Sequence, residues 1–262
     1  MSRYIRLLRI FWGNTLATEL EYRAAFWANA GLSLFWLVWA ALGAGAYFRF
    51  APSIRGWTYD ELLVVLGIFF AINGFRQAVI GPNLARMTEY VRMGTLDFLL
   101  TKPVSSQFMV SLRHVGVYNW LDPLLGWGLV LFGLIRRDEP VSWTSVLAFA
   151  LLTVAGGLVL YSLALAIQCL AVWTIGGEGL DDVVEGIVEA GRFPVQMYRG
   201  IFRTVLTFFI PVALLTTVPA EAILGRGSTG VLVVSCSIAA LLLFATSRLW
   251  VWSLRHYTGA SA

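Results

Sequence analysis

The sequence predicts an all-α polytopic membrane protein, and three observations lead to that class. Of the 262 residues, 58% are hydrophobic and only 13% are charged, whereas soluble domains carry about 25% charged residues. The apolar residues gather in runs long enough to cross a bilayer, and mostly arginines stand between the runs. This small number of charged residues could not cover a soluble globule with polar surface. We therefore expect the bilayer to be the solvent of this chain.

The first 23 residues predict a helix that lies on the membrane surface. Arg3, Arg6 and Arg9 recur at a spacing of three among apolar side chains. This pattern is typical of an amphipathic helix in the headgroup plane. We therefore separate an interfacial segment, residues 1–23, from one transmembrane domain, residues 24–262.

About six transmembrane helices are expected in that domain. The second ends at Gly81-Pro82, because proline lacks the backbone N–H that a helix interior needs. The fifth is short and contains Pro211, so it either crosses with little tilt or the chain near Pro219 dips back into the membrane. The expected spans cover roughly residues 24–48, 61–81, 108–135, 145–173, 204–218 and 230–252.

Two connections and the arginine distribution predict the orientation. Residues 83–107 are too polar to span. In the second connection, 174–203, residues 178–203 carry acids with valines at helical spacing between them and then arginines, the pattern of an amphipathic surface helix. With the N-terminus inside the cell, 14 of the 19 basic residues lie on the inner side. Cytoplasmic loops are enriched in such residues. We therefore expect both termini and both connections to be cytoplasmic.

The sequence contains no recognisable catalytic or metal-binding pattern. A P-loop needs a glycine-rich turn before its lysine, and the only lysine, Lys102, has none. The two histidines, His114 and His256, and the two cysteines, Cys169 and Cys236, stand apart from one another. We expect no ATP hydrolysis, no metal and no bound cofactor in this chain. The dispersed arginines form no basic stripe, so we expect no nucleic-acid partner.

Three polar residues inside the expected spans are candidates for a pathway or for helix packing. Asp122 is the one acid well inside a span, Asn119 precedes it by three residues, and Asn73 lies near the end of the second span. Charges at membrane depth are costly and often functional. Asp122 could line a cavity for cationic cargo, or it could hydrogen-bond a neighbouring helix.

The most informative stretch is the cytoplasmic segment 89–108. It predicts a short helix, a break at Gly94, a second apolar helix and a stop at Pro103. Its core is more apolar than that of an ordinary loop. We expect a compact element against the inner membrane face, with candidate contact residues Glu89, Arg92, Gly94, Thr95, Leu96, Asp97, Lys102 and Pro103.

This segment also resembles a known family. The letters GTLD at 94–97, KPV at 102–104 and Phe108 look like the hallmark of bacterial type-2 ABC export permeases. The stretches EYRAAFW at 21–27, FIPVA at 209–213 and PAEA at 219–222 are similar to the entry of that family's first helix and to its fifth helix and outer loop. The resemblance covers nearly the whole chain.

The resemblance implies a function and partners. Such permeases are six-helix subunits whose loop between the second and third helices docks on a separate ATPase. It implies two ATPase subunits holding ATP and Mg²⁺, a second permease of the same or a sister chain, and a bacterial cytoplasmic membrane. The cargo would be lipid-like, hydrophobic or a cationic drug.

Two other functions stay open at this point. An ion-coupled secondary transporter would normally show more ionisable groups within its spans and an internal repeat. A membrane scaffold or assembly factor would transport nothing. Association with an ATPase would separate both from the permease.

Overall fold

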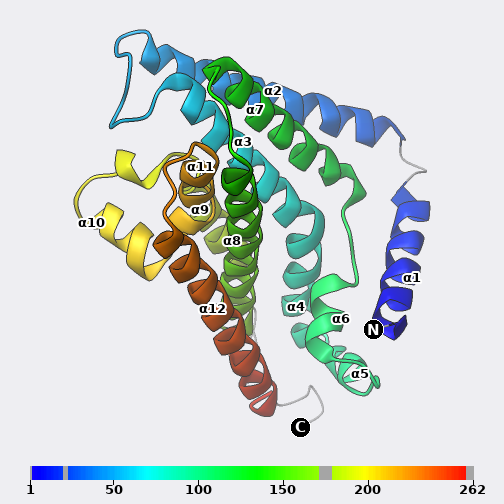
Figure 1. The fold of residues 1–262 in the computed structure, drawn as a ribbon. Coiled ribbons are helices and arrows are strands. Elements are labelled where there is room, and N and C mark those ends of the chain that lie inside the picture. The colour runs from blue at the N-terminus through cyan, green and yellow to red at the C-terminus, as the bar shows by residue number, and fades with distance from the viewer. Residues whose placement is uncertain (1, 20–22, 171–178, 258–262) are drawn as a thin grey trace.

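The structure is a computed structural model that describes residues 2–19, 23–170 and 179–257. Its regular elements are helices, as predicted, and Figure 1 shows them as a bundle with α5 and both chain termini near one end. The α-helices are α1 Ser2–Glu19, α2 Arg23–Phe48, α3 Tyr59–Phe75, α4 Gly81–Arg92, α5 Leu96–Leu100, α6 Ser106–Leu112, α7 Leu121–Arg137, α8 Trp143–Cys169, α9 Leu180–Glu189, α10 Gly200–Thr204, α11 Thr217–Ile223 and α12 Thr229–Arg255.

Four helices in the described part of the chain are long and apolar enough to cross a membrane. A fifth candidate is a pair of helices, Gly200–Phe209 and Val212–Ile223, which are bent by 67° at Ile210-Pro211. Because Pro211 ends the first of the two, this pair is either a broken span or a re-entrant loop. The four long helices are Phe26–Phe48, Tyr59–Arg92, Trp143–Cys169 and Thr229–Arg255.

The second helix does not end at Gly81-Pro82, so that part of the prediction is wrong. A π-helical turn, Arg76–Ile80, joins α3 to α4, and the helix continues to Arg92. Pro82 has no N–H to give to the carbonyl of Ala78, four residues earlier. The N–H of Gly116 occupies that carbonyl instead, at 2.7 Å. A neighbouring segment thus supplies the hydrogen bond that proline removes.

The expected third span, residues 108–135, is likewise not one helix. α6 ends at Leu112, residues 113–116 are not helical, and α7 of 17 residues follows a 3₁₀ turn. At this break Asn119 Nδ2 donates to the carbonyl oxygen of Gln77 at 3.0 Å, and Gly116 donates to Ala78. The break in one segment and the π-helical turn in the other therefore satisfy each other's backbone groups.

Glycines hold α3 and α7 in close contact. A Cβ on Gly67 would lie 2.6 Å from the nitrogen of Val130, and a Cβ on Gly126 would lie 2.4 Å from the nitrogen of Ala71. Gly74 and Gly133 are equally restricted, by Pro123 and by the carbonyl of Asp60. Small residues allow transmembrane helices to pack backbone to backbone. These four glycines therefore fix α7 against α3.

Residues 180–198 follow the length of α3 in the opposite direction. The helix predicted over 178–203 is interrupted, because α9 ends at Glu189 and an α-helix begins again only at Gly200, with α10; residue 178 lies outside the described residues. Val184 and Val188 of α9 are buried, so its apolar face packs within the protein. Three contacts give the order. Glu185 forms an ion pair with Arg76, just after α3, and the guanidinium of Arg192 lies over the ring of Phe69. Met197 and Leu62 line the same small cavity.

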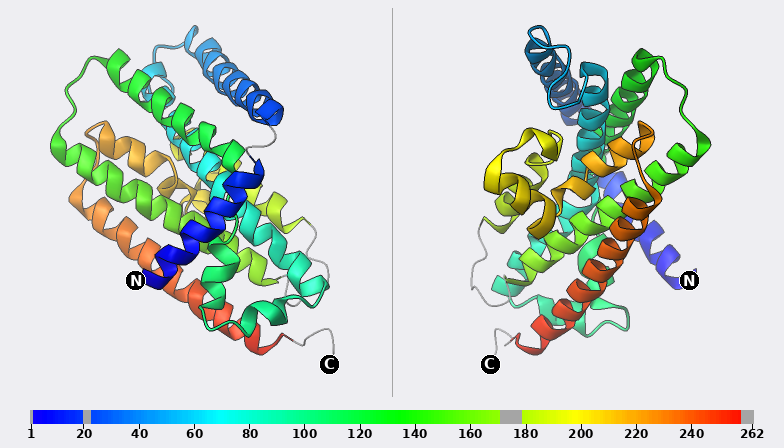
Figure 2. Two further views of the ribbon diagram at one scale, coloured as in Figure 1. Left: turned by 90° about the vertical axis from the view of Figure 1, so that its right-hand side faces the viewer. Right: turned by 60° about the vertical axis from the view of Figure 1, so that its left-hand side comes forward.

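The remaining expected elements agree with the structure within a few residues. α8 covers most of the expected fourth span, whose last residues, 171–173, lie outside the described part. α12 is the expected sixth helix. α1 is helical as predicted and packs on α6, where Trp12 donates to the carbonyl of Leu112 at 3.2 Å. Figure 2 shows α1 crossing the long helices.

The bundle has two chemically different ends. At the α5 end lie α5, α6, the last turns of α8 and α12, and Tyr257, the last residue that the structure describes. At the opposite end, which we call the α11 end, three loops meet. There Arg226 donates to the carbonyl of Gly56, and Arg137 donates to that of Leu224. Figure 1 shows the two ends at the bottom and the top of the bundle.

Candidate functional site

The segment between α4 and α6 folds into a short helix at the α5 end. The N–H groups of Met93 and Gly94 donate to the carbonyls of Glu89 and Val91, which closes α4. Gly94 has a φ of +65°, a left-handed conformation that suits glycine. α5 begins two residues later and is followed by Pro103. The predicted glycine break and second short helix are therefore confirmed, whereas the predicted first short helix is the end of the long helix that runs to Arg92.

The apolar side chains of this segment divide into an anchoring set and an exposed set. Leu96 and Leu99 are buried in the core. Phe98, between them in sequence, is 72% exposed, and Met93 is 59% exposed. Because successive residues on a helix point to different sides, α5 is attached by one face and presents an aromatic ring on another.

Four of the predicted contact residues are charged and stand close to Leu96 and Leu99 in the sequence. Glu89, Arg92 and Lys102 are exposed, and Asp97 is partly buried. No ion pair joins any of these four to another residue of the described part. Burial and the nearby carboxylate of Asp97 raise the pKa of Tyr257. The C-terminal end of α12 therefore lies beside α5.

Hydrogen bonds connect this segment to the long helices through α6. Gln107 donates from Nε2 to the hydroxyl oxygens of Tyr161 on α8 and Ser247 on α12, at 3.1 and 3.2 Å. Trp250 of α12 donates to Ser106 at 3.2 Å. Hydrogen bonds therefore join α6, which follows α5 in the chain, to both α8 and α12.

An apolar cavity of about 670 Å³ lies directly above α6. Side chains of α3, α6, α7 and α8 line it, and none of the lining residues is charged. Its polar groups are few, chiefly Gln107, Ser111, Tyr161 and Thr153. The Thr153 hydroxyl is buried and has no hydrogen-bond partner among the described residues. Pockets of this size and composition are typical of small-molecule sites.

The three polar residues predicted within the spans lie outside this lining. Asp122 is in the first turn of α7, where Ser33 of α2 hydrogen-bonds to its carboxylate. Asn119 binds the carbonyl of Gln77, as described above. Asn73 accepts from Arg76 Nε at 3.1 Å. The structure thus places all three at contacts within or between helices.

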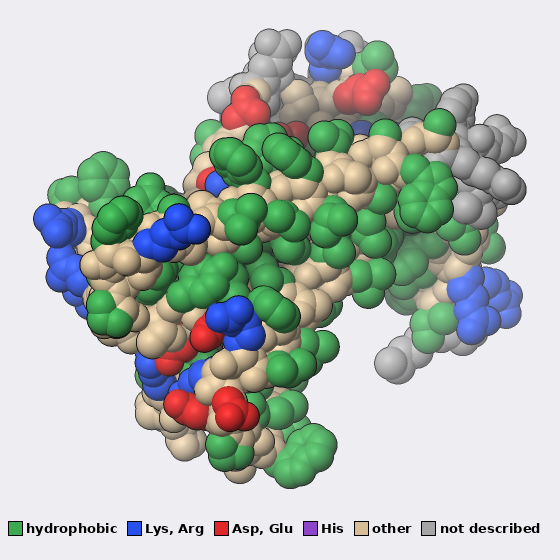
Figure 3. Space-filling model, turned by 90° about the horizontal axis from the view of Figure 1, so that it is seen from above, with side chains coloured by type: hydrophobic (Ala, Val, Ile, Leu, Met, Phe, Trp, Pro, Cys, Tyr) green, Lys and Arg blue, Asp and Glu red, His purple; other side chains and the backbone are tan. Residues whose placement is uncertain are grey.

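Sequence reasoning missed a buried carboxylate at the α11 end. Glu61 is 3% exposed and is paired with Arg226 and with Arg137, whose Nε lies 3.8 Å away. Nearby, Asp60 pairs with Arg136 at 2.6 Å on the surface. Figure 3 shows acidic and basic side chains side by side on this end of a largely hydrophobic molecule.

A sequence signal for Glu61 was available. Glu61 stands three residues after Thr58 and before an apolar run, the spacing of a capping box. The Thr58 hydroxyl accepts from the Glu61 N–H, and the Glu61 carboxylate accepts from the Thr58 N–H at 3.0 Å. The motif predicts where α3 begins, but no local pattern predicts that arginines from α7 and the α11–α12 loop reach it.

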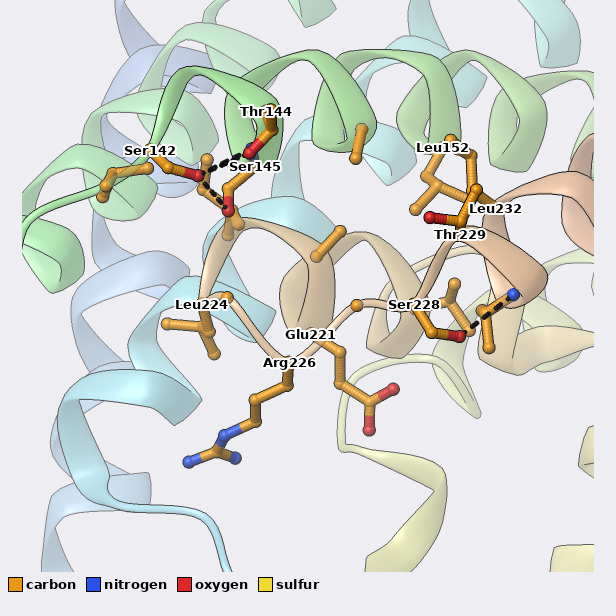
Figure 4. Close-up of a pocket in the computed structure, with 18 of the residues that line it drawn as sticks. Ser142, Thr144, Ser145, Leu152, Glu221, Leu224, Arg226, Ser228, Thr229 and Leu232 are labelled. Atoms are coloured by element: carbon orange, nitrogen blue, oxygen red, sulfur yellow. Dashed lines mark hydrogen bonds between the residues drawn. The ribbon is translucent and has the colours of Figure 1, made fainter.

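A second, polar cavity of about 590 Å³ lies at the same end (Figure 4). The α7–α8 loop, the start of α8, and the loop between α11 and α12 border it. Ser142 caps α8 and contacts the hydroxyls of Thr144 and Ser145 at 2.8 and 2.9 Å. Its lining carries both signs of charge, Glu221 and Arg226 among them. The protein therefore has a polar cavity at one end and an apolar cavity near the other.

Comparison with known proteins gives the family. No curated protein and no solved structure matches the chain. A family model described as ABC-2 family transporter protein matches residues 34–261, which include α5 and both cavities. With its membrane-spanning helices, the chain is a multi-pass membrane protein that belongs to the ABC-2 transporter family, whose domains are the transmembrane permease subunits of ABC transporters.

Proposed function

We propose that this chain is the permease subunit of an ABC exporter and that α5 is its contact with a separate ATPase. The observation that carries the proposal is the exposed ring of Phe98 between the buried side chains of Leu96 and Leu99. A large apolar ring that is held out from a firmly attached helix is a typical anchor at a protein interface.

The surroundings of Phe98 suit a docking surface. Met93 of the same segment adds exposed apolar area, and Glu89, Arg92 and Lys102 of the segment are exposed as well. Charges at the rim of an interface set its register and selectivity more than its affinity. A groove on the ATPase that accepts Phe98 and offers complementary charges would recognise this segment.

The proposed orientation places α5 and both termini in the cytoplasm. It rests on the 14 of 19 basic residues that fall on that side. ATP and Mg²⁺ would then be bound by two ATPase subunits beneath two permeases, in the cytoplasmic membrane of a bacterium. The second permease would be another copy of this chain or a sister chain.

Coupling would follow the hydrogen bonds of α6. Closure of the ATPase pair on ATP would shift α5, and α6 would follow because it begins only a few residues later. Gln107 and Ser106 link α6 to α8 and α12. The shift would therefore change the tilt of these two long helices and the shape of the cavity that α6 borders.

The test compares serine substitutions of two exposed phenylalanines that lie at opposite ends of the bundle. Phe98→Ser should reduce copurification with the ATPase and cargo-stimulated ATP hydrolysis, with a loss of binding free energy of about 2 kcal/mol. Phe50, which is 92% exposed in the α2–α3 loop, provides the control Phe50→Ser, which should change neither. Equal ATPase binding by both variants would remove α5 from the contact. Transport by the purified chain without any ATPase would instead support a secondary transporter.

A further inference from the structure

We propose that the apolar cavity binds one uncharged, single-chain amphiphile, with its hydroxyl-bearing head at the α6 end. The inference deepens the proposed function, because it names the class of cargo and the position at which the cargo enters. It makes a cationic cargo the less favoured of the classes considered above.

The composition of the wall determines the class of the occupant. The lining contains no Asp, Glu, Lys, Arg or His side chain, and aromatic and aliphatic groups such as Phe75, Trp127 and Leu158 dominate it. A charged group in such surroundings would be desolvated without a partner, which is strongly unfavourable. An apolar chain, by contrast, gains from leaving water there. The wall therefore selects for an uncharged molecule.

The polar groups at the α6 end provide a place for a head that both donates and accepts. Gln107 Nε2 donates to the hydroxyl oxygens of Tyr161 and Ser247, and the hydroxyls of Ser111 and Tyr161 hydrogen-bond to each other at 2.7 Å. No hydrogen bond from a described residue reaches Gln107 Oε1. This oxygen can therefore accept from a hydroxyl of the ligand.

The rim of the cavity indicates entry from the side. Val154 of α8 is 63% exposed, and Phe75, Trp120 and Leu158 at the rim are also exposed. In a membrane protein, an exposed apolar rim faces lipid or another apolar protein surface. An amphiphile dissolved in the bilayer can therefore reach the cavity without passing through water.

The position of the cavity connects its occupancy to the ATPase contact. Ser105, which caps α6 and also lines the cavity, lies two residues after Pro103. The head of the ligand would touch Gln107, the same side chain that links α6 to α8 and α12. An effect of ligand binding at Gln107 would therefore be transmitted to α5 through one short helix, α6.

Gly157 provides a direct way to fill the cavity. It lines the cavity, and a Cβ placed on it meets no atom within 4 Å. A leucine at this position would therefore occupy the cavity without displacing backbone. Gly128 on α7 is equally open but does not line the cavity. Gly157→Leu and Gly128→Leu are therefore matched variants, of which only the first places its side chain in the cavity.

The experiment uses a monoacylglycerol with a photoactivatable diazirine in its acyl chain and the full-length permease in lipid nanodiscs. Irradiation should label peptides of α6 and α8, and unlabelled monoacylglycerol should compete. Labelling of these peptides should fall to background in Gly157→Leu and stay at the wild-type level in Gly128→Leu. Gln107→Met, which keeps the size but removes the Oε1 acceptor together with the Nε2 donor to Tyr161 and Ser247, should weaken competition by monoacylglycerol several-fold.

Two outcomes would overturn the inference. One is equal labelling of Gly157→Leu and wild type. The other is stronger competition by a fatty acid or an alkyltrimethylammonium of the same chain length, which would refute an uncharged ligand. Because labelling needs no ATPase, a permease that is labelled yet binds no ATPase would refute the proposed function alone. A permease that couples to an ATPase but is not labelled would refute this inference alone.

Discussion

The guanidinium of Arg226 donates a hydrogen bond to the carboxylate of Glu61, which lies 165 residues earlier in the sequence, at the start of α3. Only 3% of Glu61 is exposed, and Arg137 of α7 approaches the same carboxylate. This one acid therefore joins the start of α3, the end of α7 and the α11–α12 loop.

Glu61→Gln should destabilise the fold, because it removes the buried charge that pairs with Arg226 and with Arg137, although Arg137 keeps Glu139 as a partner. Breaking one partner of a fully buried pair costs about 3–5 kcal/mol, and the 40% exposure of the Arg226 side chain places the expected loss below that range. Glutamine still serves at this position of a capping box. The control is Asp60→Asn, since the Asp60–Arg136 pair is exposed and such pairs contribute about 1 kcal/mol or less. Thermal unfolding in detergent measures both. Similar losses for the two variants would contradict the role assigned to Glu61.

Gly126→Ala should disrupt the α3–α7 contact. Its Cβ would lie 2.4 Å from the nitrogen of Ala71, so backbone must move, and overpacking of this kind costs about 1–3 kcal/mol. Gly128→Ala, two residues away and open on all sides, should not destabilise, because alanine favours the helix more than glycine does. Thermal unfolding and the yield of monodisperse protein measure the difference. A stable Gly126→Ala would mean that the two helices are not in backbone contact.

The sequence predicted which segments are apolar helices, because burial in a bilayer or a core leaves long apolar runs. It could not predict how interruptions are repaired. Pro82 signals a helix end, yet the helix continues because Gly116, from another segment, binds the freed carbonyl of Ala78. That hydrogen bond is a tertiary contact and leaves no trace in the local pattern.

The same limit explains the error over residues 178–203. Acids and arginines between valines look like a helix that faces water on one side. In the structure α9 is such a helix, with Val184 and Val188 buried and Glu185 exposed, but it ends at Glu189. Beyond that end the guanidinium of Arg192 lies over the ring of Phe69 of α3. The split of the predicted coupling segment into buried Leu96 and Leu99 and exposed Phe98 also depends on packing, although its two helices and glycine break were predictable from the sequence.

The proposed orientation can be tested with single cysteines in a variant without Cys169 and Cys236. Positions 53, 139 and 228 lie in the three loops of the α11 end, and Ser53, Glu139 and Ser228 are exposed. A membrane-impermeant maleimide should label cysteines there in intact cells. It should label Thr101→Cys, which is exposed at the α5 end, only after the cells are opened. Labelling of position 101 in intact cells would reverse the topology.

Asp122→Asn should leave cargo transport unchanged, whether the cargo is an uncharged amphiphile or a cationic dye. The side chain contacts Ser33, its Cβ faces Gly74, and it does not line the apolar cavity. Asparagine keeps the size and can still accept from the serine hydroxyl. Dye efflux from proteoliposomes with the partner ATPase measures the effect. A selective loss of cation transport in a normally assembled Asp122→Asn complex would restore the pathway role that the sequence suggested as one alternative.

Gly94→Val should uncouple ATP hydrolysis from cargo without removing the protein from the membrane. Gly94 has a φ of +65°, where a residue with a Cβ costs about 1–2 kcal/mol and a β-branched one is a genuine outlier. The turn would open, and Phe98 would no longer lie at the angle that Leu96 and Leu99 set. Asparagine tolerates the left-handed region, so Gly94→Asn should keep most of the coupling. The measurement is cargo-stimulated ATPase activity together with copurification of the ATPase. If valine and asparagine behave alike, the backbone conformation of Gly94 is not what positions α5, and the shape of this turn has no part in coupling.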